Sequence, residues 1–308
     1  MKLTRRSLLK GVAAAGAAGA AGAVYRRAEA RAKKQPPPDA VAMLFDSTRC
    51  VGCRACMEKC KEANDLPPDR VRLDGVHYDA PIDLSGTTKT VIKLYQGSGK
   101  TAFMKAQCLH CVDPACVSAC MLGALNKREY GVVTYEKNKC VGCRYCQIAC
   151  AFNVPRFEWN SPTPQIVKCE MCHHRFPEGK GPACAEVCPR EAIQFGKLKE
   201  LRAEAQKRIQ DNPWRYHPDV FGDTEVGGTQ VLYLSAVPFD KLGLPKVGDE
   251  PVPAMGETIQ HGIYKGFIAP IALYAVTAYV VVRNVRRGEA EEQEEAARKP
   301  GEGEERKP

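Results

Sequence analysis

The sixteen cysteines of this 308-residue chain fall into four groups of four, with the spacing of iron-sulfur ligands. Two groups share the pattern C-x2-C-x2-C-x3-C, and the other two are looser variants of it. Three thiolates within seven residues can hold three corners of a cubane cluster, while the fourth reaches a different cluster. The groups are Cys50, Cys53, Cys56 and Cys60; Cys108, Cys111, Cys116 and Cys120; Cys140, Cys143, Cys146 and Cys150; and Cys169, Cys172, Cys184 and Cys188.

Zinc and disulfide bonds are the competing interpretations of these cysteines. A structural zinc site takes its ligands from two separated C-x2-C pairs, whereas Cys50, Cys53 and Cys56 form a triplet. Cysteines this close together in tight turns rarely reach the geometry of a disulfide. Sixteen thiolates with none left over therefore predict four [4Fe-4S] clusters as the cofactors, with these cysteines as the iron ligands.

Histidine and lysine side chains lie beside several of the cysteines. Because sixteen thiolates complete four clusters, His110, His173 and His174 are not needed as ligands, and we expect them to face solvent or to tune a nearby cluster. Lys61 and Lys168 also adjoin predicted ligands. Positive charge there would raise the reduction potential of a cluster, but we expect both side chains to be solvated at the surface.

The segments around the cysteine groups repeat, which indicates an internal duplication. An apolar run at Met43–Phe45 precedes the first group, and Val132–Tyr135 stands in the same place before the third; both are predicted to be strands. The segments after the second and fourth groups, 123–125 and 191–193, have the pattern of a short helix and a return strand. The predicted fold class is α+β, with duplicated ferredoxin-like modules that hold two [4Fe-4S] clusters each, insertions, and one C-terminal transmembrane helix.

Three further segments have recognisable patterns. Residues 61–107 are rich in Gly, Pro, Asp and Thr and are predicted to be an insertion between cluster motifs. The stretch Lys197–Gln210 predicts a charged surface helix with four apolar residues on one face. Residues Gln230–Ser235 predict a strand.

The N-terminus has the features of a twin-arginine export signal. The stretch TRRSLLK at Thr4–Lys10 is followed by a weakly apolar Ala/Gly-rich segment, Gly11–Val24, and by an A-x-A site at Ala28–Ala30. We therefore expect residues 1–30 to be a signal peptide. Since this route exports folded proteins, the clusters would be loaded in the reducing cytoplasm, and the thiolates would be unavailable for disulfides outside it.

The C-terminal region predicts a membrane anchor. Residues Phe267–Val282 are apolar apart from one threonine, and about twenty residues of helix cover the roughly 30 Å hydrocarbon core; a buried soluble helix is the alternative. We expect a transmembrane segment over 259–285. The excess of arginines after it places the C-terminus in the cytoplasm, with a disordered tail at 286–308. The four-cluster domain, 31–258, would then lie on the periplasmic face of the bacterial inner membrane.

The formal charge of +9 does not indicate a nucleic-acid partner. A net +5 lies in residues 1–30, ahead of the expected cleavage. Four ligated clusters would add about −8, because each carries roughly −2 in its oxidised form. The mature, metal-loaded protein is therefore expected to be mildly acidic, without the basic surface that nucleic-acid binding requires.

The chain resembles the four-cluster iron-sulfur subunits of membrane-bound respiratory enzymes, the superfamily of formate dehydrogenase beta and dimethyl sulfoxide reductase B subunits. Its own export signal and single C-terminal span make it similar to HybA-type subunits of periplasmic [NiFe] uptake hydrogenases. The stretches that carry the resemblance are MLFDSTRCVGC, CLHCVDPACVSAC, CVGCRYCQIACAFNVP, GGTQVLYLSAVPF and IQHGIYKGFIAP.

The resemblance implies a crossed pattern of ligation. Some relatives replace one ligand of the second motif with Trp and hold a three-iron cluster, but Cys120 is present here. The implied ligand sets are Cys50, Cys53, Cys56 and Cys188; Cys60, Cys169, Cys172 and Cys184; Cys108, Cys111, Cys116 and Cys150; and Cys120, Cys140, Cys143 and Cys146.

The resemblance also implies a non-catalytic electron-transfer role, so no catalytic residues are expected. Electrons would pass through four [4Fe-4S] clusters from the hydrogenase small subunit, which is bound to its [NiFe] large subunit, to a multi-helix membrane subunit that reduces quinone. The alternative donor is a molybdopterin enzyme such as formate dehydrogenase, although those subunits commonly leave the cytoplasm on a partner's signal. An enzyme in its own right would usually leave one iron without a protein ligand, and sixteen cysteines leave no such vacancy.

Overall fold

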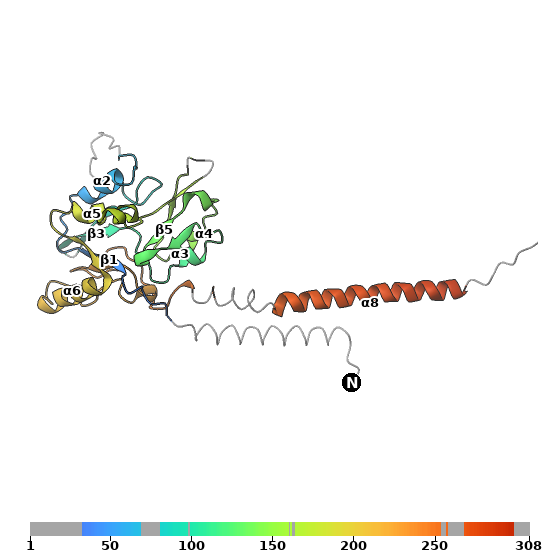
Figure 1. The fold of residues 1–308 in the computed structure, drawn as a ribbon. Coiled ribbons are helices and arrows are strands. Elements are labelled where there is room, and N and C mark those ends of the chain that lie inside the picture. The colour runs from blue at the N-terminus through green and yellow to red at the C-terminus, as the bar shows by residue number, and fades with distance from the viewer. Residues whose placement is uncertain are drawn as a thin grey trace, which may run out of the picture. The chain divides into compact units, whose positions relative to one another are not determined.

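The computed structural model describes residues 33–68, 81–97, 99–159, 161, 164–253, 257 and 268–298. Residues 31–255 form one compact unit, and the helix α8 (Ile268–Arg298) belongs to a second (Figure 1). The predicted signal, 1–30, lies outside the described residues, as does the beginning of the predicted anchor.

A three-stranded sheet lies at the centre of the compact unit. Strand β1 (Val41–Asp46) pairs antiparallel with β8 (Ile193–Lys197) and parallel with β9 (Val231–Leu234). Because successive side chains of a strand point to opposite faces, β1 contributes to two separate cores. One face packs on α6 (Leu198–Asp211), and the other packs in a core that contains several of the cysteines. The predicted strands and the predicted helix in these three regions are confirmed.

Two modules of matching organisation hold the cysteine groups. In the first, α2 (Ala55–Glu62) packs against α5 (Ala183–Glu186) beside the β1–β8 pair. The second places α3 (Ala115–Ser118) against α4 (Tyr145–Ala149) beside an antiparallel pair. That pair is β4 (Leu125–Lys127) and β5 (Val133–Tyr135). The first module therefore joins the two ends of the compact unit, and the second is built from its middle.

The segment 61–107 contains a regular antiparallel hairpin, which its turn-rich composition did not indicate. Strands β2 (Val91–Gly97) and β3 (Lys100–Ala106) pair along their whole length. The remaining pair is β6 (Arg156–Phe157) with β7 (Ile166–Val167). Short 3-10 helices lie at Glu129–Gly131, Lys137–Lys139, His173–Glu178 and Glu225–Gly227.

A buried ion pair fixes α6 to the end of β1. The Asp46 side chain is fully buried and accepts hydrogen bonds from Arg208 Nη1 at 3.2 Å and from the Tyr216 hydroxyl at 2.9 Å. Its other oxygen accepts the Thr48 backbone N–H at 2.9 Å. These bonds satisfy a charge that would otherwise be costly to bury, and they order the chain just before Cys50.

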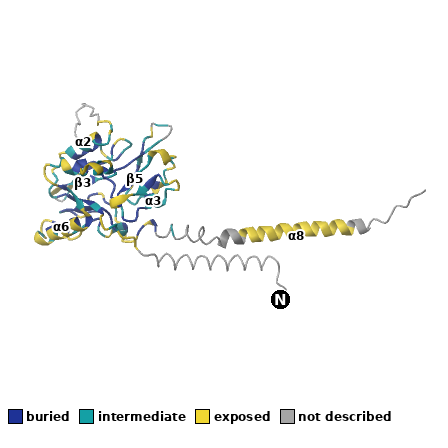
Figure 2. Ribbon diagram, in the orientation of Figure 1, coloured by how far each residue is buried: buried dark blue, intermediate teal, exposed yellow. Residues whose placement is uncertain are grey.

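Helix α8 continues to Arg298, so residues 286–298 are helical where a disordered tail was predicted. The reason is that Glu, Ala, Gln and Arg are strong helix formers, and an i,i+4 pair of Arg287 with Glu291 at 3.8 Å supports the helix. Figure 2 colours residues 273–294 of α8 as exposed. Among the described residues, the structure has no helix that is both long and apolar enough to span a bilayer.

Candidate metal centres

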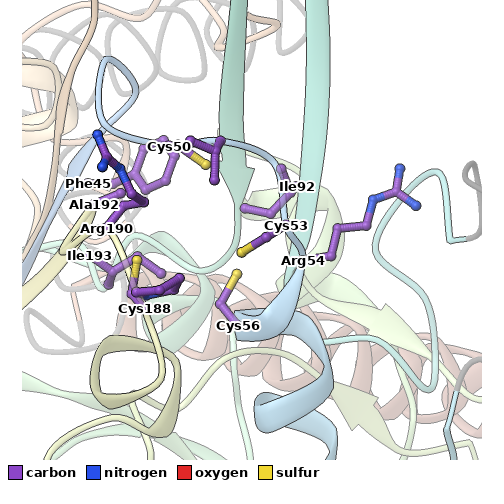
Figure 3. A pocket seen from close by; sticks show the side chains of 12 residues that line it. Phe45, Cys50, Cys53, Arg54, Cys56, Ile92, Cys188, Arg190, Ala192 and Ile193 are labelled. Carbon is purple, nitrogen blue, oxygen red and sulfur yellow. The ribbon is translucent and has the colours of Figure 1, made fainter.

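Four cysteines from the two ends of the compact unit surround one cavity. The sulfurs of Cys50, Cys53, Cys56 and Cys188 lie around a shared space between the first cysteine loop and the segment after α5 (Figure 3). The cavity has an empty volume of about 350 Å³, which includes space open to solvent, and is otherwise lined mainly by apolar side chains, among them Phe45, Ile92 and Ile193. These four cysteines are called the first set.

Left-handed residues shape the loop that presents three of these sulfurs. Gly52 has φ +71° and Arg54 has φ +61°, so the chain curls and the cysteines on either side face inward. The third cysteine group repeats this geometry at Gly142 and Arg144. There the Gly142 N–H donates to Cys140 Sγ at 3.4 Å. Backbone N–H groups directed at sulfur are the usual partners of cluster thiolates.

A second set of four cysteines lines a neighbouring cavity of about 310 Å³. Asn64 Nδ2 lies 3.8 Å from Cys60 Sγ and 3.9 Å from Cys172 Sγ, which bridges residues distant in sequence. The Met171 N–H donates to Cys169 Sγ at 3.3 Å. The members of the second set are Cys60, Cys169, Cys172 and Cys184.

The other eight cysteines form two further sets in the second module. Burial raises the pKa of the Cys111 thiol, and three neighbouring thiolates raise it further. Burial likewise raises the pKa of Cys146 to about 12, again with three thiolates contributing. The third set is Cys108, Cys111, Cys116 and Cys150, and the fourth is Cys120, Cys140, Cys143 and Cys146.

The structure thus brings together the same sets that the family resemblance implies, while ligation itself stays a prediction. Cysteines of neighbouring sets lie close enough to interact electrostatically, so the sets follow one another in a row from the first to the fourth. The linking pairs are Cys56 with Cys184, Cys108 with Cys169, and Cys116 with Cys146.

The two ends of this row reach the surface. Cys53 of the first set and Cys143 of the fourth are exposed. Apolar side chains are exposed beside them: Val51 next to the first set, and Val141 and Ile148 next to the fourth. In the second set all four cysteines are buried. The row therefore runs from one surface position, through the interior, to another.

The donor chemistry fits cubane clusters. All sixteen cysteines are free thiols. Burial is the largest cause that raises the pKa of Cys56 and of Cys169 to about 11. Such thiols keep their protons at neutral pH, so assembly of a cluster must release protons. Within the described part of the chain, no group of three or more Cys, His, Asp or Glu side chains is arranged to hold a single metal ion.

Two lysines expected at the surface are buried. Lys61 donates to the Thr87 carbonyl at 2.9 Å, and Lys168 donates to the Val133 carbonyl at 2.6 Å. The expectation of solvated side chains was wrong because neighbouring carbonyls take the place of water around each ammonium. Sequence alone contained no signal for this, since the acceptors come from other segments.

The histidines beside the cysteines separate into two kinds. His174 is exposed and His173 half-buried, as expected. His110 is completely buried, which excludes the solvent-facing alternative and leaves the one of tuning a nearby cluster. Its Nδ1 accepts the Val133 N–H at 3.0 Å, so a neutral ring carries its proton on Nε2, and that atom has no hydrogen-bond partner among the described residues.

Comparison with known proteins supports the chemistry of the four sets. Residues 100–198 match the family described as a 4Fe-4S dicluster domain. The hydrogenase-2 operon protein HybA of Escherichia coli O157:H7 is 38% identical, over 92% of this chain and 96% of its own length. The chain belongs to the HybA family. A protein of Nitratidesulfovibrio vulgaris is 41% identical over 84% of this chain and 71% of its own.

The chain is also similar to formate dehydrogenase iron-sulfur subunits. The nitrate-inducible formate dehydrogenase iron-sulfur subunit of Escherichia coli K12 is 36% identical, over 75% of this chain and 79% of its own. This similarity confirms the superfamily that the sequence indicated. With the dicluster match and the cysteine spacing, it identifies multiple [4Fe-4S] clusters as the cofactors of this HybA-family chain.

Proposed function

We propose that this protein relays electrons through four [4Fe-4S] clusters, from a periplasmic [NiFe] hydrogenase to a quinone-reactive membrane subunit. The observation that carries the proposal is the row of four cysteine sets with an exposed cysteine at each end. When bound, each cluster accepts and releases one electron. The chain's own residues hold the clusters, exclude water from the middle sets and direct backbone N–H groups at the sulfurs.

The role is non-catalytic in this proposal, and the crossed sets are the ligand sets. The first and second sets hold clusters in the module made from the chain's two ends, and the third and fourth hold clusters in the middle module. The entry and exit points are the surfaces around Cys53 and Cys143, because these are the exposed members of the terminal sets. The hydrogenase small subunit and the membrane subunit are the proposed partners at these two surfaces.

The proposed location is the periplasmic face of the inner membrane, with export by the twin-arginine route and a C-terminal anchor at 259–285. The support is the TRRSLLK stretch and the apolar composition of 267–282. Apolar side chains of α8 such as Leu273, Val276 and Tyr279 are exposed. Over residues 273–282 the exposed side chains of α8 are apolar apart from Thr277, which favours contact with lipid over water for this part of the helix.

The test is purification of the intact complex in mild detergent, followed by subunit identification and electron paramagnetic resonance. We expect about sixteen irons per chain and four cluster signals that hydrogen reduces. Formate is the comparison, because formate dehydrogenase iron-sulfur subunits are also relatives. Reduction by formate but not by hydrogen would show that the electron donor is a molybdopterin enzyme and not a hydrogenase. Twelve irons per chain would contradict the four-cluster assignment.

A further inference from the structure

Lys105 is a buried lysine on the wall of the second cysteine set's cavity. Only 1% of the residue is exposed. Its charge also acts on Cys56 of the first set. An ammonium this deeply buried is costly unless an opposite charge compensates it.

The hydrogen bonds of Lys105 do not supply that charge. Its Nζ donates to Thr90 Oγ1 at 2.7 Å and to Gln107 Oε1. Both acceptors are neutral, and both residues are buried. The Thr90 hydroxyl donates its own proton to the Ala106 carbonyl at 3.2 Å, so it can only accept from Lys105. An ammonium has three N–H donors, and these two bonds leave one for the cavity.

The negative charge that compensates Lys105 is on sulfur. Lys105 lines the same cavity as Cys60, Cys169, Cys172 and Cys184, so these sulfurs are the groups nearest to it that can carry negative charge. Burial disfavours the charged form of Lys105, and thiolates at Cys184 and Cys56 favour it. Bound clusters keep that charge in place, because their cysteines are thiolates.

The β2–β3 hairpin brings this charge to its position. Alternate residues of a strand share a face, so Phe103 and Lys105 of β3 point the same way. The Phe103 ring lies against Gly52 in the loop of the first set. The Tyr233 hydroxyl donates to the Lys105 carbonyl at 2.8 Å, which ties this part of β3 to β9. One strand face thus contacts the first set and lines the second.

We propose that the Lys105 ammonium is a fixed counter-charge shared by the first two clusters, and that it raises the reduction potentials of both. The inference rests on the proposed function, since it requires clusters on these sets. Reduction makes a cluster more negative, so a nearby cation stabilises the reduced form. Little water separates the charges, and their interaction is therefore weakly screened. Lys105 would in this way favour electrons on the first half of the row.

The test is Lys105→Met in the intact, cluster-loaded complex, with redox titration followed by electron paramagnetic resonance. At a given potential we expect the reduced-to-oxidised ratio of the first two clusters to fall about tenfold, which is about 59 mV for a one-electron couple. The reduction potentials of the third and fourth clusters should change much less. Signals are assigned with Cys188→Ser for the first set and Cys172→Ser for the second.

Two variants separate charge from packing. Lys105→Arg keeps the charge and should retain wild-type potentials. Lys93→Met removes a half-exposed lysine from the same hairpin and should change none of the four. Unchanged potentials in Lys105→Met, an equal shift of all four clusters, or the same loss in Lys105→Arg would each overturn the inference.

Loss of iron is the remaining outcome. If Lys105→Met loses iron, the titration is repeated with Lys105→Gln, which has a neutral polar side chain. Loss of iron in that variant too would show that Lys105 is needed for the structure of the sites and does not set their potentials. That result would also overturn the inference. Failure of the proposed function is seen separately. It would appear as missing cluster signals in the wild-type protein, before any variant is compared.

Discussion

Cys188 and Cys172 belong to the same cysteine group in the sequence but to different sets in the structure. Cys188 lines the cavity of the first set, with three cysteines that lie more than a hundred residues earlier. Cys172 lines the cavity of the second. At the residue scale, long-range packing therefore decides which cavity each of these cysteines reaches.

Serine substitutions test this crossed arrangement. Cys188→Ser should damage the cluster held by Cys50, Cys53 and Cys56, because it removes their fourth sulfur, and iron should fall from about sixteen to about twelve per chain. Cys172→Ser should instead damage the cluster of the second set. Iron content and spectra of the two purified proteins provide the measurement. If both substitutions removed the same signal, ligation would follow the sequence groups and not the sets.

At the scale of elements, the hairpin and the first cysteine loop are fitted to each other. A Cβ on Gly52 would lie 2.3 Å from a ring carbon of Phe103, and the backbone there has φ +71°. Gly99, at the end of the same hairpin, has φ +70°, and a Cβ on it would meet nothing within 4 Å. Substitutions at the two glycines therefore distinguish the effect of backbone strain, which both share, from that of steric contact, which occurs only at Gly52.

Gly52→Ala should be clearly more damaging than Gly99→Ala. Both cost about 1–2 kcal/mol for a left-handed non-glycine residue, but only Gly52→Ala adds overpacking, which typically costs a further ~1–3 kcal/mol. Denaturation monitored by cluster absorbance gives the comparison. Equal losses in the two variants would show that the loop and Phe103 do not constrain each other. Adding Phe103→Leu to Gly52→Ala should recover the steric part alone.

At the scale of the whole molecule, the compact unit and the C-terminal segment have separate roles in the proposal. The four sets all lie within residues 31–255. The predicted anchor and export signal lie outside this unit. Cluster binding should therefore survive changes that alter the location of the protein.

Deletion of 259–308 tests that separation. The truncated protein should appear in the soluble periplasmic fraction with about sixteen irons per chain, because the anchor is removed and the sets are intact. The full chain should stay with membranes after an alkaline carbonate wash. Replacing Arg5 and Arg6 by lysine should instead keep the protein in the cytoplasm. Release of the full-length chain by carbonate would contradict a membrane-spanning anchor.

The sequence by itself determined the cofactor chemistry and much of the local structure. In the first and third groups, spacing alone brings three sulfurs together, since they lie within seven residues of one another. Local apolar patterns also predicted β1, β5 and β9 correctly. The same local patterns did not predict the β2–β3 hairpin within 61–107. They also predicted a disordered tail where α8 continues to Arg298.

Only the tertiary structure decided how the groups combine. Lys61 and Lys168 are buried against carbonyls, and Lys105 against a hydroxyl, of other segments. The buried His110 ring accepts a backbone N–H from Val133. The pairing of the first cysteine group with the last likewise follows from β1 lying beside β8. The physical reason is that a ligand spacing is a property of a few neighbouring residues, whereas the charge and solvation around each set come from every element packed against it.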